Sequence, residues 1–176
     1  MNRPLLYAGL CLLTLASFSP QKKKKGAAVQ NTVSTTDYKA VGGPLPELRV
    51  VSPKGRVITG KDIDTSGNFF LMMFNPTCGH CEDVTRMLAK NLDQFREGQI
   101  LLVAGDAMMP YMDYFNATTK VFDYPKIWLG VDSSKIIEKT FVYNSLPQVN
   151  IYNKNRKLVK IFTGEVPLDS LRPYIR

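Results

Sequence analysis

The chain has 176 residues, of which 44% are hydrophobic, including nine Phe, eight Tyr and one Trp. This composition supports one globular domain with its own core, and it excludes disordered, collagen-like and coiled-coil classes. The formal net charge is +8, but five of the 23 Lys and Arg lie in the first 25 residues, where no acid occurs. The other bases are scattered among acids, so we expect no nucleic-acid-binding face.

The first 19 residues are predicted to be a signal peptide or a membrane anchor. Arg3 precedes an apolar run of fourteen residues, 5–18, which suits a signal sequence and is shorter than the about 18 residues of a membrane span. The block Lys22–Lys25 follows and opposes translocation, so cleavage and membrane retention both stay open. Residues 20–43 are predicted to be a flexible basic tether, and 44–176 the folded domain.

The folded domain begins with two short extended runs, 48–51 and 56–58, around the turn residues 53–55. This pattern predicts a β-hairpin. The next run, 68–74, is almost wholly apolar and lies between Gly67 and Pro76, which predicts a strand buried on both faces.

A helix is predicted to begin at Cys78 and to end at Gly98, because apolar residues recur along one helical face at Val84, Met87, Leu88, Leu92 and Phe95. Residues 100–104 predict a second buried strand. A strand, a helix and a strand of these lengths form a βαβ unit with parallel pairing.

The second half of the domain alternates short apolar runs with turn residues. Tyr111, Met112, Tyr114 and Phe115 are predicted to face the core from a short helix. The remaining predicted elements are a strand at 126–129, a helical turn at 135–141, a hairpin of 149–152 with 158–162, and a closing helix at 166–175.

The chain's chemistry centres on Cys78-Gly79-His80-Cys81. Cysteines three residues apart lie on one helix face within bridging distance. The amino terminus of a helix stabilises a thiolate, and His80 adds a group that can carry positive charge. We therefore expect Cys78 to be the nucleophile that forms a mixed disulfide with a substrate, and Cys81 to resolve it. Gly79 leaves the tip narrow enough for a bulky disulfide to approach.

Two structural interpretations compete with this one. Zinc sites also use Cys-x-x-Cys, but His80 is the only His in the chain and no second cysteine pair follows, so we predict no metal site. An inert structural disulfide is the other alternative. The position between a buried strand and a helix start favours a reactive pair instead.

The segment Phe74-Asn75-Pro76-Thr77-Cys78-Gly79-His80-Cys81 resembles the active site of the thioredoxin superfamily. Its Cys-Gly-His-Cys tetrapeptide is similar to that of protein disulfide isomerases, whereas the lead-in Leu45-Pro46-Glu47-Leu48 resembles the TlpA/ResA branch of envelope thioredoxins. A second family motif follows in order, because Leu146-Pro147-Gln148-Val149-Asn150 is similar to the family's cis-proline strand.

The resemblance implies an α/β thioredoxin-like fold, a central mixed β-sheet flanked by helices with an N-terminal β-hairpin extension. It implies a cis Pro147 facing the cysteine pair, and a substrate groove that includes Thr77 and the backbone of Leu146. Gly79 and His80 support the site, and no cofactor is expected beyond a redox-active Cys78–Cys81 disulfide.

Two positions depart from the family. The buried acid that helps deprotonate the resolving thiol is replaced by Met72, so proton transfer must use another group, with Glu82 or water as candidates. Thr77 stands where many relatives carry Trp, which makes the expected groove less apolar.

The function that these features predict is a thiol–disulfide oxidoreductase of the bacterial envelope, periplasmic and either secreted or anchored. Its expected partners are exported proteins with disulfides and a membrane-embedded electron donor, and reduction is the expected direction. Net oxidation or isomerisation remains an alternative. Others are a Cu(I) metallochaperone using Cys78, Cys81 and His80, and a redox-dead peptide-binding module.

Overall fold

A computed structural model describes residues 36–142 and 145–175. The predicted signal segment 1–19 and the tether as far as residue 35 lie outside the described residues. Within the described ranges, no helix has the length and apolar character that crossing a bilayer requires.

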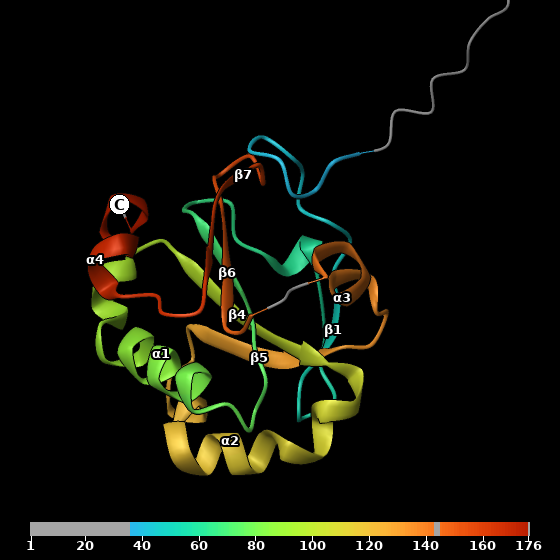
Figure 1. Cartoon of the computed structure of the whole chain (residues 1–176), viewed down its shortest axis with the longest axis vertical. Helices are drawn as coiled ribbons and strands as arrows, with labels where there is room; N and C mark the ends of the chain where they lie inside the picture. Colours follow the sequence, from blue (N-terminus) through green and yellow to red (C-terminus); the bar gives the residue numbers. More distant parts are fainter. Residues whose placement is uncertain (1–35, 143–144, 176) are drawn as a thin grey trace, which may run out of the picture. The chain divides into compact units, whose positions relative to one another are not determined.

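One seven-stranded mixed sheet organises the domain (Figure 1), with the strand order β2-β1-β5-β4-β3-β6-β7. The three central strands β3, β4 and β5 are parallel, whereas β6 pairs antiparallel with β3 and β7 antiparallel with β6. The bounds are β1 Arg49–Val51, β2 Val57–Thr59, β3 Phe69–Met73, β4 Gln99–Gly105, β5 Ile127–Asp132, β6 Gln148–Tyr152 and β7 Leu158–Thr163. The predicted hairpins and the strand buried on both faces are confirmed.

The α-helices lie on both faces of this sheet. Their bounds are α1 Gly79–Lys90, α2 Met112–Thr119, α3 Ile136–Phe141 and α4 Leu168–Leu171. Residues of α1, α2 and α4 share one apolar core cluster with Met72 and Cys81, and residues of α3 share a second cluster with Leu71. The alternation of strand side chains explains this division, because neighbouring residues of a strand point to opposite faces.

Helix α1 ends earlier than predicted. Asn91 caps it, and its Nδ2 donates a hydrogen bond of 2.8 Å to the carbonyl oxygen of Met87. Leu92–Phe95 then forms a 3₁₀ turn that still buries Phe95 in the core. The apolar spacing therefore continues past Lys90 although the α-helix does not, because an Asn side chain competes for the helix's own backbone acceptors.

Two other helices differ from the predictions. In and before α2, Met112 and Phe115 are buried as expected, but Tyr111 is 46% exposed and Tyr114 is 53% exposed. The helix is amphipathic and its aromatic residues divide between the two faces. The predicted closing helix is shorter, with Pro167 as the N-cap of α4 and a 3₁₀ turn over Arg172–Tyr174 completing it.

The segment before β1 packs on the domain. Tyr38 contacts the core cluster on the α3 face. The amide nitrogen of Gly42 donates to the carbonyl oxygen of Leu158 at 2.8 Å, and the amide of Leu158 donates back to Gly43 at 2.7 Å. Residues 36–43, the last part of the predicted tether, therefore contact the folded domain.

The single tryptophan lies far along the sheet from the cysteines. Trp128 is the second residue of β5 and pairs with Leu101 near the start of β4. The guanidinium carbon of Arg56 lies 4.5 Å from the Trp128 ring centroid, a cation–π contact between the β1–β2 hairpin and β5.

Candidate functional site

The cysteine pair lies where β3 ends and α1 begins. In a sheet with parallel central strands, the loops after those strands gather at one edge, which is the usual position of a functional site. Cys78 is the N-cap of α1 with an extended backbone (φ −98°, ψ 116°), and Cys81 lies within the first turn. Both are free thiols, Cys78 partly exposed and Cys81 fully buried.

Hydrogen bonds accepted by Asn75 shape the turn that precedes the cysteines. Asn75 Oδ1 accepts hydrogen bonds of 2.9 Å from both the amide nitrogen and Oγ1 of Thr77. The Asn75 carbonyl oxygen accepts from the amide of Cys78 at 3.1 Å. Because Pro76 cannot continue the strand ladder, these bonds hold the chain in a turn that places Cys78 at the helix start.

The two thiols have different surroundings. Burial raises the pKa of the Cys81 thiol to about 12, and the Cys78 sulfur and the Glu82 carboxylate act in the same direction. A hydrogen bond with the Asn75 backbone opposes them. Cys78 instead borders solvent at the positive end of the α1 dipole, where backbone N–H groups are without helical partners. Cys78 is therefore the accessible sulfur at the helix start, and Cys81 is the buried thiol that keeps its proton.

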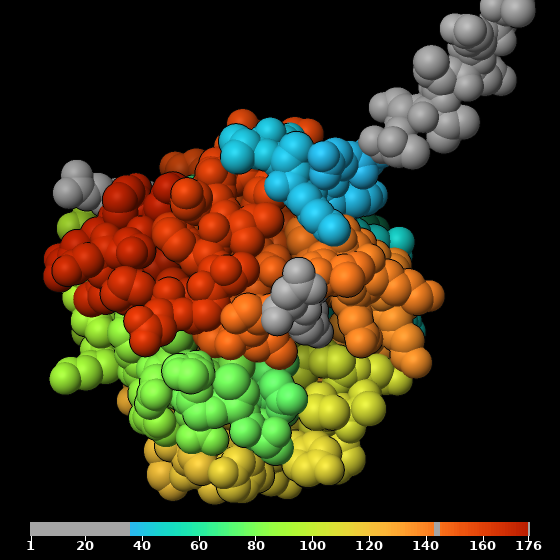
Figure 2. Space-filling model, in the orientation of Figure 1, coloured from blue at the N-terminus to red at the C-terminus, as the bar shows by residue number. Residues whose placement is uncertain are grey.

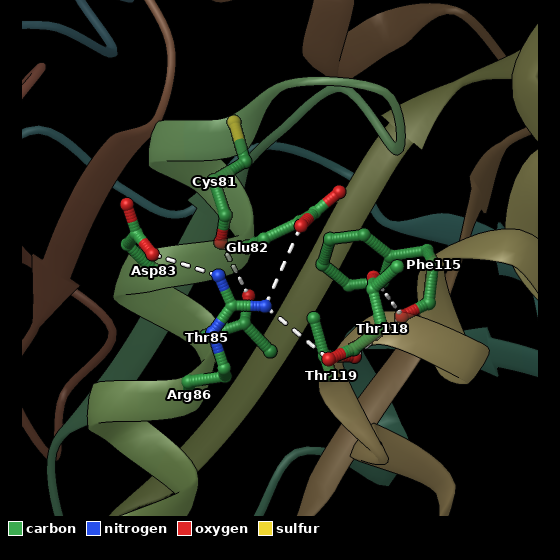
Figure 3. A network of polar contacts seen from close by, with 8 residues as sticks. All are labelled: Cys81, Glu82, Asp83, Thr85, Arg86, Phe115, Thr118 and Thr119. Carbon is green, nitrogen blue, oxygen red and sulfur yellow. Dashed lines mark hydrogen bonds and ion pairs between the residues drawn. The ribbon is translucent and has the colours of Figure 1, made fainter.

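A polar network follows Cys81 along α1 (Figure 3). Arg86 donates to Asp83 Oδ1 at 2.7 Å, to Glu82 Oε2 at 3.4 Å and to the carbonyl oxygen of Thr118 at 3.2 Å, which joins α1 to α2. The Glu82 side chain is only 14% exposed, whereas that of Asp83 is 70% exposed. Glu82 is thus a largely buried carboxylate beside the buried thiol.

Pro147 lies at the same edge of the sheet as the cysteines. The bond between Leu146 and Pro147 is cis, as the resemblance implies. Gln148 pairs with Met73, the last residue of β3, so Pro147 lies next to the turn that carries Cys78. Pro147 is buried and Leu146 partly exposed. Cys78 and Leu146 both pack against the core cluster that contains Cys81.

The other predicted site residues lie on the surface of this edge. Thr77, Gly79 and His80 are exposed. A Cβ atom built on Gly79 meets nothing within 4 Å, so glycine there leaves the approach to Cys78 clear without being required by packing. In Figure 2 the green surface of the cysteine segment and early α1 borders orange surface from the segment that leads into β6.

Three parts of the site were not predicted from the sequence. The turn held by Asn75 could have been predicted from the sequence, because Asn before Pro favours an Asx turn. The Arg86 contact with α2 joins residues 32 positions apart and has no local signal. A groove that runs from His80 to Pro167 also depends on long-range packing. Among residues 36–142 and 145–175, no three His, Cys, Asp or Glu side chains gather closely enough to hold a metal ion.

Comparison with known proteins rests on structure, since no family model and no curated protein sequence matches the chain. A secreted disulfide oxidoreductase of Mycobacterium tuberculosis, homologous to DsbE of E. coli, aligns with a TM-score of 0.60 and 13% identity over 73% of this chain and 93% of its own. The thioredoxin domain of a thiol-disulfide oxidoreductase from Bacteroides vulgatus gives 0.61 and 18%, covering 76% and 94%.

An exposed lipoprotein thioredoxin of Streptococcus pneumoniae aligns with a TM-score of 0.56 and 20% identity, over 74% of this chain and 98% of its own. Sequence identities this low show a likeness of fold alone. Together with the sheet order described above, they show that this chain has a thioredoxin-like fold, and its Cys-x-x-Cys pair lies where β3 leads into α1.

Proposed function

We propose that this protein is an exported thiol–disulfide oxidoreductase that reduces cysteine pairs of other exported proteins through Cys78 and Cys81. The observation that carries the proposal is the contrast between the two sulfurs. One borders solvent at a helix amino terminus, and the other is buried one turn further on. This is what a nucleophile and a resolving thiol require.

The exchange proceeds in two balanced steps. The Cys78 thiolate attacks one sulfur of the substrate disulfide, which forms a mixed disulfide and releases the other substrate sulfur as a thiolate. Cys81 then loses its proton and attacks the Cys78 sulfur, which forms the Cys78–Cys81 disulfide and releases the second substrate thiolate. Two electrons pass to the substrate, and the protons lost by the two cysteines balance those taken up by the substrate thiolates.

Proton removal from Cys81 is the demanding part, because burial raises the pKa of this thiol to about 12. We assign the acceptor role to Glu82, directly or through one water. Its carboxylate is the acidic group that acts on Cys81, it is largely buried, and Arg86 holds it in place. Met72 offers no acid at the position where the family has one.

The cellular setting is also part of the proposal. The expected signal or anchor at 1–19 and the likeness to a secreted and an exposed lipoprotein oxidoreductase support export to the envelope. The reductive direction rests on the resemblance to the TlpA/ResA branch. It also requires an electron donor, which we expect to be membrane-embedded, to return Cys78 and Cys81 to the dithiol form after each turnover.

The chemistry is tested by trapping. Purified protein should catalyse insulin reduction by dithiothreitol, and Cys78→Ser should abolish this activity. Cys81→Ala should instead accumulate mixed disulfides with substrates when expressed in the envelope of its host, and these should disappear in the Cys78→Ser/Cys81→Ala double variant. Full activity in Cys78→Ser is incompatible with the proposal, and so is the absence of mixed disulfides in Cys81→Ala.

The direction is tested by equilibrating the pair in glutathione buffers. A reductase should have a potential more negative than about −200 mV, whereas a value near about −120 mV is typical of an oxidant and would reverse the direction. The reversed result leaves the oxidoreductase chemistry intact, so the two parts of the proposal are separable.

A further inference from the structure

A shallow groove of about 290 Å³ begins at His80 and runs along the outer side of α1. Its far wall is the segment that joins β7 to α4. The lining combines apolar residues, Val84, Met87, Val166 and Pro167, with the exposed side chains of His80, Asp83 and Glu165. The volume lies at or below the roughly 300–1,000 Å³ of small-molecule pockets, so the groove suits a single side chain better than a cofactor.

The groove is continuous with the reactive edge, because His80 belongs to the cysteine tetrapeptide itself. The residues beside a substrate cysteine that is joined to Cys78 can therefore reach this groove along the His80 side. Gly79 leaves that path open, since no protein atom lies within 4 Å of a Cβ built there.

The charge of the groove contrasts with that of the chain. The chain carries a net charge of +8, yet the groove lining contains two acids, Asp83 and Glu165, and no Lys or Arg. Asp83 shares Arg86 with Glu82, which leaves two carboxylates for one guanidinium. Among the described residues, Glu165 is exposed and takes part in none of the ion pairs.

From this geometry we propose that the groove selects substrates with Lys or Arg beside the reactive cysteine. Both side chains combine a long aliphatic stem with a terminal charge, so the stem covers the apolar lining residues while the charge reaches the carboxylates of Asp83 and Glu165. Glu165 is the main specificity residue, because its carboxylate has no competing partner. The inference rests on the proposed oxidoreductase function and defines its substrate class.

The test uses three short peptides, each with one cysteine in a mixed disulfide with glutathione and with Lys, Gln or Glu on both sides of it. The rate of reduction by the reduced protein is measured by quenched-flow mass spectrometry. The Lys peptide should react about two- to fivefold faster than the Gln peptide, as expected for one exposed charge pair, and the Glu peptide more slowly. About 0.5 M NaCl should reduce these differences.

Charge reversal then locates the effect. Glu165→Lys should invert the order of the Lys and Glu peptides. Glu97→Lys is the matched control, because Glu97 is also an exposed acid but lies just before the amino end of β4, away from the cysteine edge, and should leave the order unchanged. Glu165→Gln, which adds no charge, should make the Lys preference smaller, and thermal unfolding verifies that each variant is folded.

The outcomes separate the two proposals. Equal rates for the three peptides, or the same inversion in Glu97→Lys, overturn the groove assignment and leave the oxidoreductase function standing. If none of the peptides is reduced at all, the proposed function itself falls.

Discussion

The two faces of the central sheet are built differently. Toward α1 and α2, strands β3, β4 and β6 contribute only apolar side chains, and Met72 lies in the same cluster as Cys81. Toward α3, β6 contributes a row of buried polar residues, Gln148, Asn150 and Tyr152. Gln148 Nε2 donates to Asn150 Oδ1 at 2.9 Å, and burial raises the pKa of the Tyr152 phenol.

This difference shows where the protein places its buried polarity. The polar row lies on the face opposite to the resolving sulfur, so the sheet itself offers Cys81 no proton acceptor. The raised pKa of Cys81 is a consequence of that apolar face. A proton acceptor for Cys81 therefore has to lie outside the sheet, and Glu82 on α1 is the acidic group that acts on this thiol.

The largest expected effect on stability comes from placing a polar group on the apolar face of the sheet. Met72→Asn removes a fully buried side chain and leaves an amide without partners. We expect a loss of about 3 to 5 kcal/mol in the free energy of unfolding, measured by urea denaturation. Met87→Asn, on the partly exposed side of α1, is the control and should cost about 1 kcal/mol or less. Equal losses at both positions would mean that the face is not the cause.

The next effect concerns Glu82. Glu82→Gln should slow insulin reduction about a hundredfold, at the low end of general acid–base effects, because Cys81 loses its proton acceptor. Asp83→Asn is the matched control, since it also removes a carboxylate from Arg86, but the Asp83 side chain is 70% exposed and Glu82 is the acid that raises the pKa of Cys81. In a Cys81→Ala background, Glu82→Gln should not change the rate of mixed-disulfide formation. A similar loss of activity in Asp83→Asn would reassign the effect to the Arg86 network.

A smaller effect follows from the pKa of Cys81, which is raised from 9.0 to about 12 in the folded protein. Between these values the unfolded chain releases the proton and the folded protein keeps it, so the reduced protein loses stability as pH rises from 9 toward 12. At pH 10 the loss is about 1 kcal/mol. Urea unfolding of the reduced protein between pH 8 and about 10.5 should show this loss, and Cys81→Ser should lack that component. Parallel curves for the two proteins would contradict the raised pKa.

The smallest expected effect is that of the link between α1 and α2. Arg86→Gln removes two ion pairs and the bond to Thr118, but the Arg86 side chain is 44% exposed. We expect a loss of about 0.5 kcal/mol or less in unfolding free energy. Thermal denaturation at low and high salt measures it, and a loss above about 2 kcal/mol would show that the network is a structural rather than a surface feature.

The parts of the fold that the sequence predicts are those with local periodicity. The apolar run at 68–74 specifies a strand buried on both faces, and the turn residues 153–155 between two short extended runs specify the hairpin of 149–152 with 158–162. The end of α1 was missed, since Asn91 stops the helix while the apolar spacing continues. The exposed Tyr111 and Tyr114 were missed because aromatic content alone does not identify the buried face.

The candidate site also has features that local sequence predicts and features that it does not. The cysteine pair, Pro147 and the departure at Met72 are visible in short motifs, and the structure places them at one edge or in one cluster. The Arg86 bond to Thr118 and the wall of the groove at Glu165 depend on segments that meet only after folding. Their sequence neighbours do not predict these contacts.

The location of Trp128 determines what intrinsic fluorescence can report. Its indole lies under Arg56 near the amino end of β5, and Thr77 occupies the place beside the cysteines where many relatives carry an indole. Quenching by a nearby disulfide, which depends on close contact, is therefore not available as an optical readout of oxidation here. The emission should instead follow denaturation alone, with the same spectrum for the dithiol and disulfide forms.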